Sequence, residues 1–337
     1  MQKTSPLITT FLGHFEFNRG RAQSSVDAYL RQLTRLQLHL ESIGKTLELA
    51  TPDDLSHFTG KFLHDLGIAP RSRRQPISAV KTFYKWLKKS GVISKDPAAG
   101  LSYPATGRRI GEQMSLAHLE DIFQSLDLDE FIDVRDMAIL GILAGCGLRV
   151  AGLVALNRSD LTFDRDVVTG YEYAELRVTE KGGHERIVPV PDEAHYAIRA
   201  YYGHSYHQQI DASLANGDQP LFLNTKHPRL PDHENVGPRR RLTRGGVLRM
   251  IKRRGAAAGV DAKYCHPHAL RHLYGTELIE SGVDSQVIGS LMGHSDPKST
   301  KVYLHLAQRL RRDAVRKGNP LSKIKTPLSG LVDALRR

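Results

Sequence analysis

The sequence predicts a mainly α-helical protein with a small antiparallel β-sheet, divided into two domains of unequal size. Three observations support this prediction. Apolar residues recur at helical spacing through the first hundred positions, a stretch of proline, glycine and charge interrupts them near residue 104, and two alternating segments flank residue 182. A chain of 337 residues is also long enough to build two separate cores.

The first domain, residues 1–103, is predicted to consist of helices. Leucines at mostly helical spacing occupy residues 25–42, and Thr51-Pro52 places a capping residue before a proline in the first turn of a second helix. The clearest amphipathic helix covers residues 74–89. Its apolar stripe comprises Ile77, Val80, Tyr84 and Leu87, and its basic stripe comprises Arg74, Lys81, Lys85 and Lys88.

A linker is predicted at residues 104–112, followed by a larger domain at 113–318 and a tail at 319–337. Helical patterns cover 116–126 and 133–145. Residues 173–179 and 185–190 alternate apolar and polar side chains around Gly182-Gly183, which predicts a hairpin. The chain then becomes helical again beyond His195, apart from a loop-like stretch at about 216–238.

The charge of the chain favours a polyanionic partner. It carries 48 Lys+Arg against 36 Asp+Glu, a net charge of +12, which favours nucleic acid ahead of a membrane surface. Two windows hold basic residues without any acid, residues 71–89 and 238–254. We predict DNA contacts from the basic stripe of the first window and from Arg239, Arg240, Arg241 and Arg244 in the second, although a solvated helix face would give the same pattern for the stripe.

The remaining composition predicts a cytoplasmic protein. Two cysteines, Cys146 and Cys265, define no disulfide framework or metal-ligand spacing. The first residues lack the basic-then-apolar pattern of a signal peptide, and no apolar run approaches the roughly 18–20 residues that span a bilayer. We therefore expect a bacterial cytosolic or nucleoid protein, with no membrane partner.

Several residue types suited to phosphate chemistry gather near the end of the chain. His268 and Arg271 lie three apart and share a helical face, and Pro267 favours a helix start, where an anion is stabilised. His294 lies in a predicted turn and Tyr303 on the next helix. Taken singly, the first pair could be a surface pair and the tyrosine core filler. A metal site using the flanking His266 and His272 is disfavoured because no matching ligand pair is present.

These segments resemble the catalytic boxes of the tyrosine recombinases, the phage-integrase and Xer-like family. The matching segments are Gly147-Leu-Arg149-Val, Pro267-His268-Ala-Leu-Arg271-His272, Leu291-Met-Gly-His294-Ser and Val302-Tyr303-Leu-His305. The resemblance covers nearly the whole chain. It implies a helical, SAM-like core-binding domain before the catalytic domain, and it adds Lys181, because the family carries its catalytic lysine in a β-turn between the arginine boxes.

The resemblance also implies a mechanism without metal, ATP or any other cofactor. Tyr303 would attack the scissile phosphate and form a 3′-phosphotyrosine link. Arg149, Arg271 and His294 would hold the phosphate oxygens, Lys181 would protonate the leaving 5′-oxygen, and His268 would act as base toward the tyrosine. The implied partners are double-stranded DNA sites, a dimer on each site and a homotetramer on two, with accessory DNA-bending proteins possible in some systems.

One position departs from the family pattern, and two other functions stay open at the sequence level. The family usually has an acidic residue three positions after the first arginine, where this chain has Gly152. We expect activity to survive this change. The alternatives are a type IB topoisomerase-like strand transferase and a catalytically inactive DNA-binding relative. The tail is expected to form a helix from Thr326 that either packs on its own domain or is exchanged between subunits.

Overall fold

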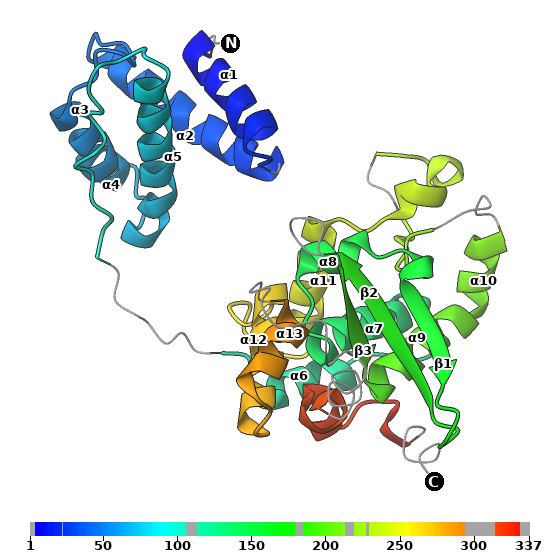
Figure 1. Cartoon of the computed structure of the whole chain (residues 1–337). Helices are drawn as coiled ribbons and strands as arrows, with labels where there is room; N and C mark the ends of the chain where they lie inside the picture. Colours follow the sequence, from blue (N-terminus) through cyan, green and yellow to red (C-terminus); the bar gives the residue numbers. More distant parts are fainter. Residues whose placement is uncertain are drawn as a thin grey trace. The chain divides into compact units, whose positions relative to one another are not determined.

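A computed structural model describes residues 4–21, 23–105, 113–179, 185–212, 219–226, 229–293 and 314–330. The chain divides into two compact units, residues 1–110 and 111–337. Each unit has its own hydrophobic core, and each is described separately below (Figure 1).

The first unit is helical throughout its described elements. These are α1 (Pro6–Gly13), a π-helical turn (His14–Asn18), α2 (Gln23–Ser42), α3 (Pro52–His57), a second π-helical turn (Phe58–Phe62), α4 (Leu63–Asp65) and α5 (Pro70–Lys89). Helix α3 begins as the sequence predicts: the Thr51 side chain accepts from the Asp54 N–H, and the Asp54 carboxylate accepts from the Thr51 N–H.

Helix α5 confirms the predicted amphipathic pattern and extends it toward the N-terminus. All four residues of the apolar stripe are at most 2% exposed, and the Tyr84 hydroxyl donates to the Leu47 carbonyl at 2.8 Å. The helix starts at Pro70, with no side-chain cap, and it accommodates Pro76 in its second turn. The basic residues therefore lie on a helix whose opposite face is anchored in the core.

The second unit combines helices with one small sheet. Its helices are α6 (Leu116–Gln124), α7 (Phe131–Gly145), α8 (Val150–Ala155), α9 (Asp192–Gly203), α10 (Ser205–Ala212), α11 (Arg244–Ala257), α12 (Pro267–Glu280) and α13 (Ser285–Met292). Short 3₁₀ turns lie at Arg158–Asp160, Asp232–Glu234, Gly237–Arg240 and Pro320–Lys323. The strands β1 (Leu161–Arg165), β2 (Glu172–Thr179) and β3 (Glu185–Val190) form an antiparallel sheet in that order.

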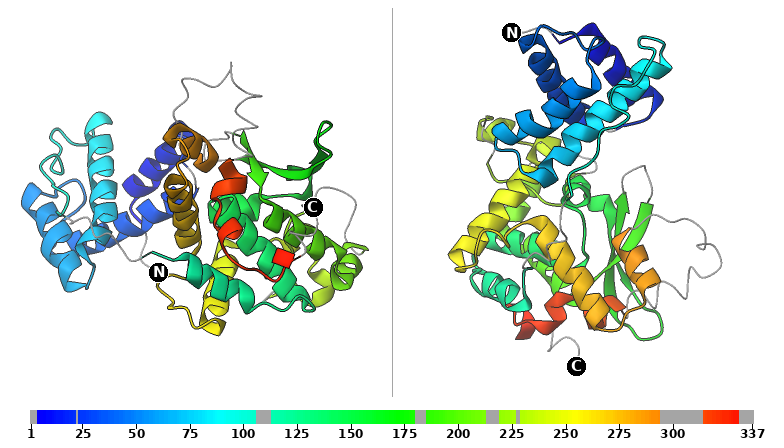
Figure 2. Two further views of the ribbon diagram at one scale, coloured as in Figure 1. Left: turned by 90° about the horizontal axis from the view of Figure 1, so that it is seen from below. Right: turned by 90° about the vertical axis from the view of Figure 1, so that its left-hand side faces the viewer.

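Helix α7 is the centre of the second core. Nearly every residue from Phe131 to Gly145 is buried except Ile132 and Asp133, and α7 packs extensively against α9. The sheet lies across these two helices, and α12 packs beside α7 (Figures 1 and 2). The predicted hairpin is confirmed as β2 and β3. Strand β1 was not predicted: its sequence Leu-Thr-Phe-Asp-Arg alternates apolar and polar residues over only four positions, and only its first residue is buried.

Candidate active site

Three of the six predicted catalytic residues lie in the part of the chain that the structure describes. These are Arg149, His268 and Arg271. Lys181, His294 and Tyr303 fall outside the described residues. The paired strand ends Thr179 and Glu185 bracket Lys181 in the chain, and α13 ends directly before His294 with Gly293 in the left-handed region at φ +63°.

Arg149 stands at the beginning of α8 and is exposed. Its backbone is extended (φ −68°, ψ 142°), as is usual for a residue that precedes a helix. Two residues earlier, Gly147 has φ +60°, a conformation that side chains other than glycine rarely adopt. The turn at Gly147 thus leads the backbone from the buried end of α7 to Arg149 at the surface of the unit.

The start of α12 positions the second catalytic box. His266 caps the helix, its Nδ1 accepting from the Ala269 N–H at 3.0 Å, and Pro267 occupies the first turn. His268 is exposed in this first turn, whereas Arg271, one turn later, is only 4% exposed. The capping role of His266 was missed by the sequence analysis, which weighed this residue only as a metal ligand.

Backbone carbonyls hold the Arg271 guanidinium. Nη1 donates to the Gly147 carbonyl at 2.5 Å, and Nη2 donates to the Met292 carbonyl. The first acceptor belongs to the turn that precedes Arg149, and the second to the last residue of α13, two positions before His294. Arg271 therefore links the three boxes that the sequence placed far apart.

The surroundings of His268 favour its neutral form. Burial lowers its pKa, and the nearby charges of His272, Arg271, His266 and Arg149 lower it further. The rings of His268 and His272 lie 4.7 Å apart in an edge-to-face arrangement. A neutral imidazole beside two arginines is able to accept a proton.

Gly152 brings α8 close to the sheet. A Cβ atom built at this position would lie 3.3 Å from Cγ1 of Val178 in β2, so a side chain there would require the Val178 methyl group to move by a few tenths of an ångström. The absence of the family's usual acid at this position thus coincides with tight packing of α8 on β2.

The basic residues of α5 differ in their availability. Arg74, Lys85 and Lys88 are exposed, and Arg74 lies over the Tyr103 ring at 4.9 Å. Lys81, in contrast, donates to the carbonyls of Ala99 and Leu101 at 3.3 and 2.6 Å. Lys81 thus anchors the chain that follows the helix, and we remove it from the predicted set of phosphate contacts.

Arg240 and Arg241 also serve the protein itself. Arg241 Nη1 donates to the carbonyls of Val154, Ala155 and Leu156 at 3.0–3.1 Å, and its Nη2 bonds Asn157. These carbonyls end α8 and have no acceptor role within the helix. Arg240 is 8% exposed and donates to the Asn224 carbonyl. Both residues are withdrawn from the predicted DNA-contact set, whereas Arg239 and Arg244 are exposed.

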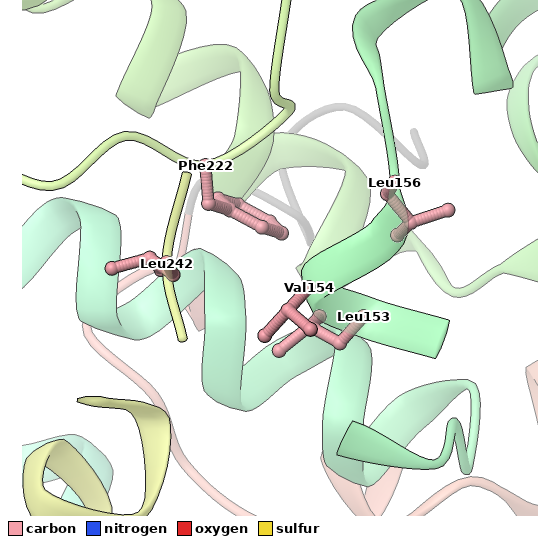
Figure 3. A pocket seen from close by; sticks show the side chains of 5 residues that line it. All are labelled: Leu153, Val154, Leu156, Phe222 and Leu242. Carbon is pink, nitrogen blue, oxygen red and sulfur yellow. The ribbon is translucent and has the colours of Figure 1, made fainter. Parts of the chain in front are cut away.

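Apolar packing beside Arg241 fixes this arrangement. Leu153, Val154 and Leu156 at the end of α8 meet Phe222 and Leu242 around a space with no room for a water molecule (Figure 3). Because this space cannot hold even a water molecule, the five side chains pack as part of the core rather than as a ligand site.

A group of buried acids neutralises further arginines. Asp136 in α7 is fully buried and accepts from Arg135 at 2.6 Å, from Arg253 at 2.9 Å and from Arg254 at 2.8 Å. Arg254 also pairs with Asp133. Beside this network lies a cavity of about 660 Å³ with a basic lining that includes Lys226, Arg249 and Arg253. Arg249 is exposed in α11, so this part of the unit still presents positive charge.

The described part of the tail packs on its own unit. Leu321 and Leu328 are buried in the second core, and the Lys325 N–H and carbonyl bond Glu120 and Gln124 of α6. Within segment 314–330, red in Figure 1, Lys325 therefore bonds α6, and Val315 packs with Leu278 of α12 and Leu291 of α13. The helix expected from Thr326 onward falls largely on residues outside the described ranges.

Two further expectations concern metal and membrane. Within the described ranges, no three His, Cys, Asp or Glu side chains come together as metal ligands, and no helix has the length and apolarity to cross a bilayer.

Comparison with known proteins identifies the family of both units. The profile of the phage integrase family matches residues 105–309, and that of the phage integrase N-terminal SAM-like domain matches residues 8–91. Tyrosine recombinase XerD of Yersinia pestis is 31% identical over 312 residues, which cover 92% of this chain and 96% of that protein. Tyrosine recombinase XerD of Pseudomonas putida is 31% identical over 304 residues, 90% of this chain and 93% of the relative.

Solved structures share the fold at lower sequence identity. The XerH site-specific recombinase bound to palindromic difH substrate, in a post-cleavage complex, superposes with a TM-score of 0.63 at 16% identity, covering 91% of this chain and 83% of that one. A lambda integrase(75–356) dimer bound to a COC′ core site gives 0.57 at 18% identity, covering 88% and 98%. The family match over residues 105–309 and the 31% identity to XerD of Yersinia pestis establish that the chain belongs to the phage integrase family of tyrosine recombinases.

Proposed function

We propose that the protein is a site-specific DNA recombinase that cleaves and rejoins strands through a covalent link to Tyr303. The observation that carries this proposal is the position of Arg271. Its guanidinium is bonded to the turn before Arg149 and to the residue two positions before His294, so one side chain connects the boxes that must act on one phosphate.

The proposed roles follow from the charge and chemistry of each residue. Arg149 and Arg271 hold the non-bridging oxygens of the scissile phosphate, because a guanidinium stays charged and bonds in a planar fork. His294 donates a further hydrogen bond. His268 accepts the Tyr303 proton as the hydroxyl attacks phosphorus, and Lys181 gives a proton to the leaving 5′-oxygen. The phosphodiester is exchanged for a phosphotyrosine ester, so strand joining needs no external energy source.

The exposed cations complete the proposed DNA interface. We assign phosphate contacts to Arg74, Lys85 and Lys88 on α5 and to Arg239 and Arg244 around the start of α11, since these side chains reach solvent. Arg249 at the basic cavity is a further candidate. We propose a cytoplasmic protein that acts as a dimer on each site and as a tetramer on two. A lambda integrase tetramer bound to a Holliday junction has the same fold, at a TM-score of 0.58 and 19% identity.

The test requires a DNA site, which is obtained by repeated selection of protein-bound duplexes from a random pool. Selected duplexes carrying nicks at successive positions are then incubated with the protein without metal or ATP. A nick close to the cleavage point releases the short 5′-hydroxyl strand and traps the covalent complex. We expect a detergent-resistant protein–DNA adduct that is absent in Tyr303→Phe.

Two results would favour the other functions. Binding of a selected site without any adduct would identify an inactive DNA-binding relative. Relaxation of supercoiled plasmids that lack the selected site, at the same rate as plasmids that contain it, would identify a topoisomerase-like strand transferase. The adduct alone does not separate the two enzymes, so the plasmid comparison is needed beside it.

A further inference from the structure

We propose that Tyr274 and Gly147 form a positioning pair that fixes the plane of the Arg271 guanidinium. The inference rests on the proposed recombinase function and adds two residues that support the phosphate-binding arginine without touching DNA. It assigns to the aromatic ring of α12 the task of holding the turn whose carbonyl orients Arg271.

The first step is the contact between the turn and the ring. Gly147 has φ +60°, and a Cβ atom built there would lie 2.2 Å from Cδ1 and 2.7 Å from Cε1 of Tyr274. No side chain fits in that space, so the backbone of Gly147 lies directly on the ring. The ring thereby limits how the Gly147 carbonyl can point.

The second step is the geometry of α12. Tyr274 follows Arg271 by three positions, so the two side chains are neighbours on one helical face. The ring contacts the Gly147 turn, and the Arg271 Nη1 takes the carbonyl of the same residue at 2.5 Å. One face of α12 therefore holds this turn at two points, and the turn leads within two residues to Arg149.

The third step distinguishes the ring from the hydroxyl. Tyr274 is fully buried, and its hydroxyl makes no hydrogen bond in the structure. The ring, rather than the hydroxyl, must therefore be the part of the side chain that the site uses.

The opposite side of the guanidinium is built by a similar close contact. A Cβ atom on Gly275 would lie 3.1 Å from both Sδ and Cε of Met292, the residue whose carbonyl accepts from Arg271 Nη2. Two adjacent residues of α12, Tyr274 and Gly275, thus contact the two residues that hold Arg271. These two main-chain acceptors therefore orient the guanidinium from both sides.

The test compares two glycines with similar backbone conformation. Gly147→Ala introduces a methyl group against the ring at φ +60°. Gly282→Ala carries the same strain, at φ +74°, but its methyl group meets no atom within 4 Å. At saturating selected DNA, we expect Gly147→Ala to form the covalent adduct about 10²-fold more slowly with unchanged DNA affinity, as displacement of a catalytic group does. Gly282→Ala should keep the normal rate.

Substitutions of the ring give the second arm. Tyr274→Phe should react at the normal rate, whereas Tyr274→Leu should be slow. In the double variant Gly147→Ala/Tyr274→Leu, the rate of adduct formation should fall by less than the two single effects combined, because the methyl group no longer meets the ring. Equal rates for Gly147→Ala and Gly282→Ala, or a Tyr274→Phe variant as slow as Tyr274→Leu, would overturn the proposal.

A readout without DNA separates this inference from the proposed function. In arginine-labelled protein, the Arg271 side chain should give an NMR signal with restricted rotation about Nε–Cζ. That restriction should disappear in Gly147→Ala and persist in Gly282→Ala. Should the normal protein form no adduct, the recombinase proposal fails, and the NMR comparison still decides whether the pair holds Arg271.

Discussion

Helix α5 and residues 239–254 carry similar runs of basic residues without an acid, and the structure uses the two runs differently. On α5, only Lys81 and Arg73 bond the protein's own carbonyls, and Arg74, Lys85 and Lys88 remain exposed. In the second run, five of the eight basic residues bond the protein itself: Arg239, which pairs with Glu234 but stays exposed, and Arg240, Arg241, Arg253 and Arg254.

The difference lies in what the rest of the chain supplies. Helix α5 packs through an apolar stripe, so its cations need no partner. The second run instead packs beside α7, which contributes the buried Asp136 and the partly buried Asp133, and beside the carbonyls that end α8. Positive charge in a sequence window is therefore available for DNA only where the fold leaves it unused.

Asp136→Asn should produce the largest of the expected effects, a loss of stability of the second unit. The change leaves three arginines around a neutral side chain in a buried network. Loss of one partner from such a network costs about 3–5 kcal/mol, which thermal or denaturant unfolding of the second unit measures. Asp121→Asn, on the exposed face of α6, is the matched control and should leave stability unchanged. Equal stability of the two variants would mean that the buried network contributes little.

Arg241→Ala and Arg244→Ala should separate structural from DNA-binding arginines three residues apart. Loss of Arg241 removes the donor to the Val154 and Ala155 carbonyls, while the Leu156 carbonyl still accepts from the Leu221 N–H, so we expect about 1–3 kcal/mol of destabilisation. Arg244 is exposed, so its loss should spare stability and weaken DNA binding. The opposite assignment of the two effects, measured by unfolding and by titration with selected DNA, would contradict the structural role of Arg241.

On α5, the comparison is between Lys85 or Lys88 and Lys81. Each phosphate contact contributes about 0.9 to the slope of log affinity against log salt concentration. We expect Lys85→Ala and Lys88→Ala each to reduce that slope by about this amount. Lys81→Ala should leave the slope unchanged, because its ammonium group bonds the carbonyls of Ala99 and Leu101. A slope that falls equally in all three variants would restore Lys81 to the interface.

The sequence was sufficient for elements with strong local patterns. The stripe of α5 and the cap at Thr51 are set by spacing within one helix, and β2 and β3 show alternation around a glycine turn. Strand β1 was missed because its apolar and polar residues alternate only from Leu161 to Asp164, the shortest stretch that can indicate a strand. The order of the boxes identified the family, but that order carries no information on what orients Arg271.

Most of the missing information was long-range. The bonds from Arg271 to Gly147 and Met292 span 124 and 21 positions, and the bond from Arg254 to Asp136 spans 118. The role of His266 as a helix cap was local, however. A histidine directly before Pro267 at a helix start was a usable signal for it, since residues at this position commonly accept from the first free N–H groups.

The charges of Arg271 and Arg149 also lower the pKa of His268, and the resulting pH dependence is the smallest of the expected effects. Burial and the surrounding positive charges place the pKa of His268 below the ordinary 6.5. If His268 is the base toward Tyr303, its neutral form is required, so cleavage should be lost only as pH falls through this lowered pKa. The acid limb of kcat/KM, which reports the free protein, should then have its midpoint below 6.5.

His272→Gln sharpens this prediction. Among the charged neighbours, His272 lowers the pKa of His268 most, after the effect of burial. Its replacement by a neutral residue should therefore move the midpoint of the acid limb upward, while His268→Gln should slow cleavage and remove the limb. The His272→Gln variant keeps Arg149 and Arg271, so its DNA affinity at neutral pH should not change. A midpoint that stays fixed in His272→Gln would show that another group titrates, and that the charges around Arg271 act on the phosphate alone.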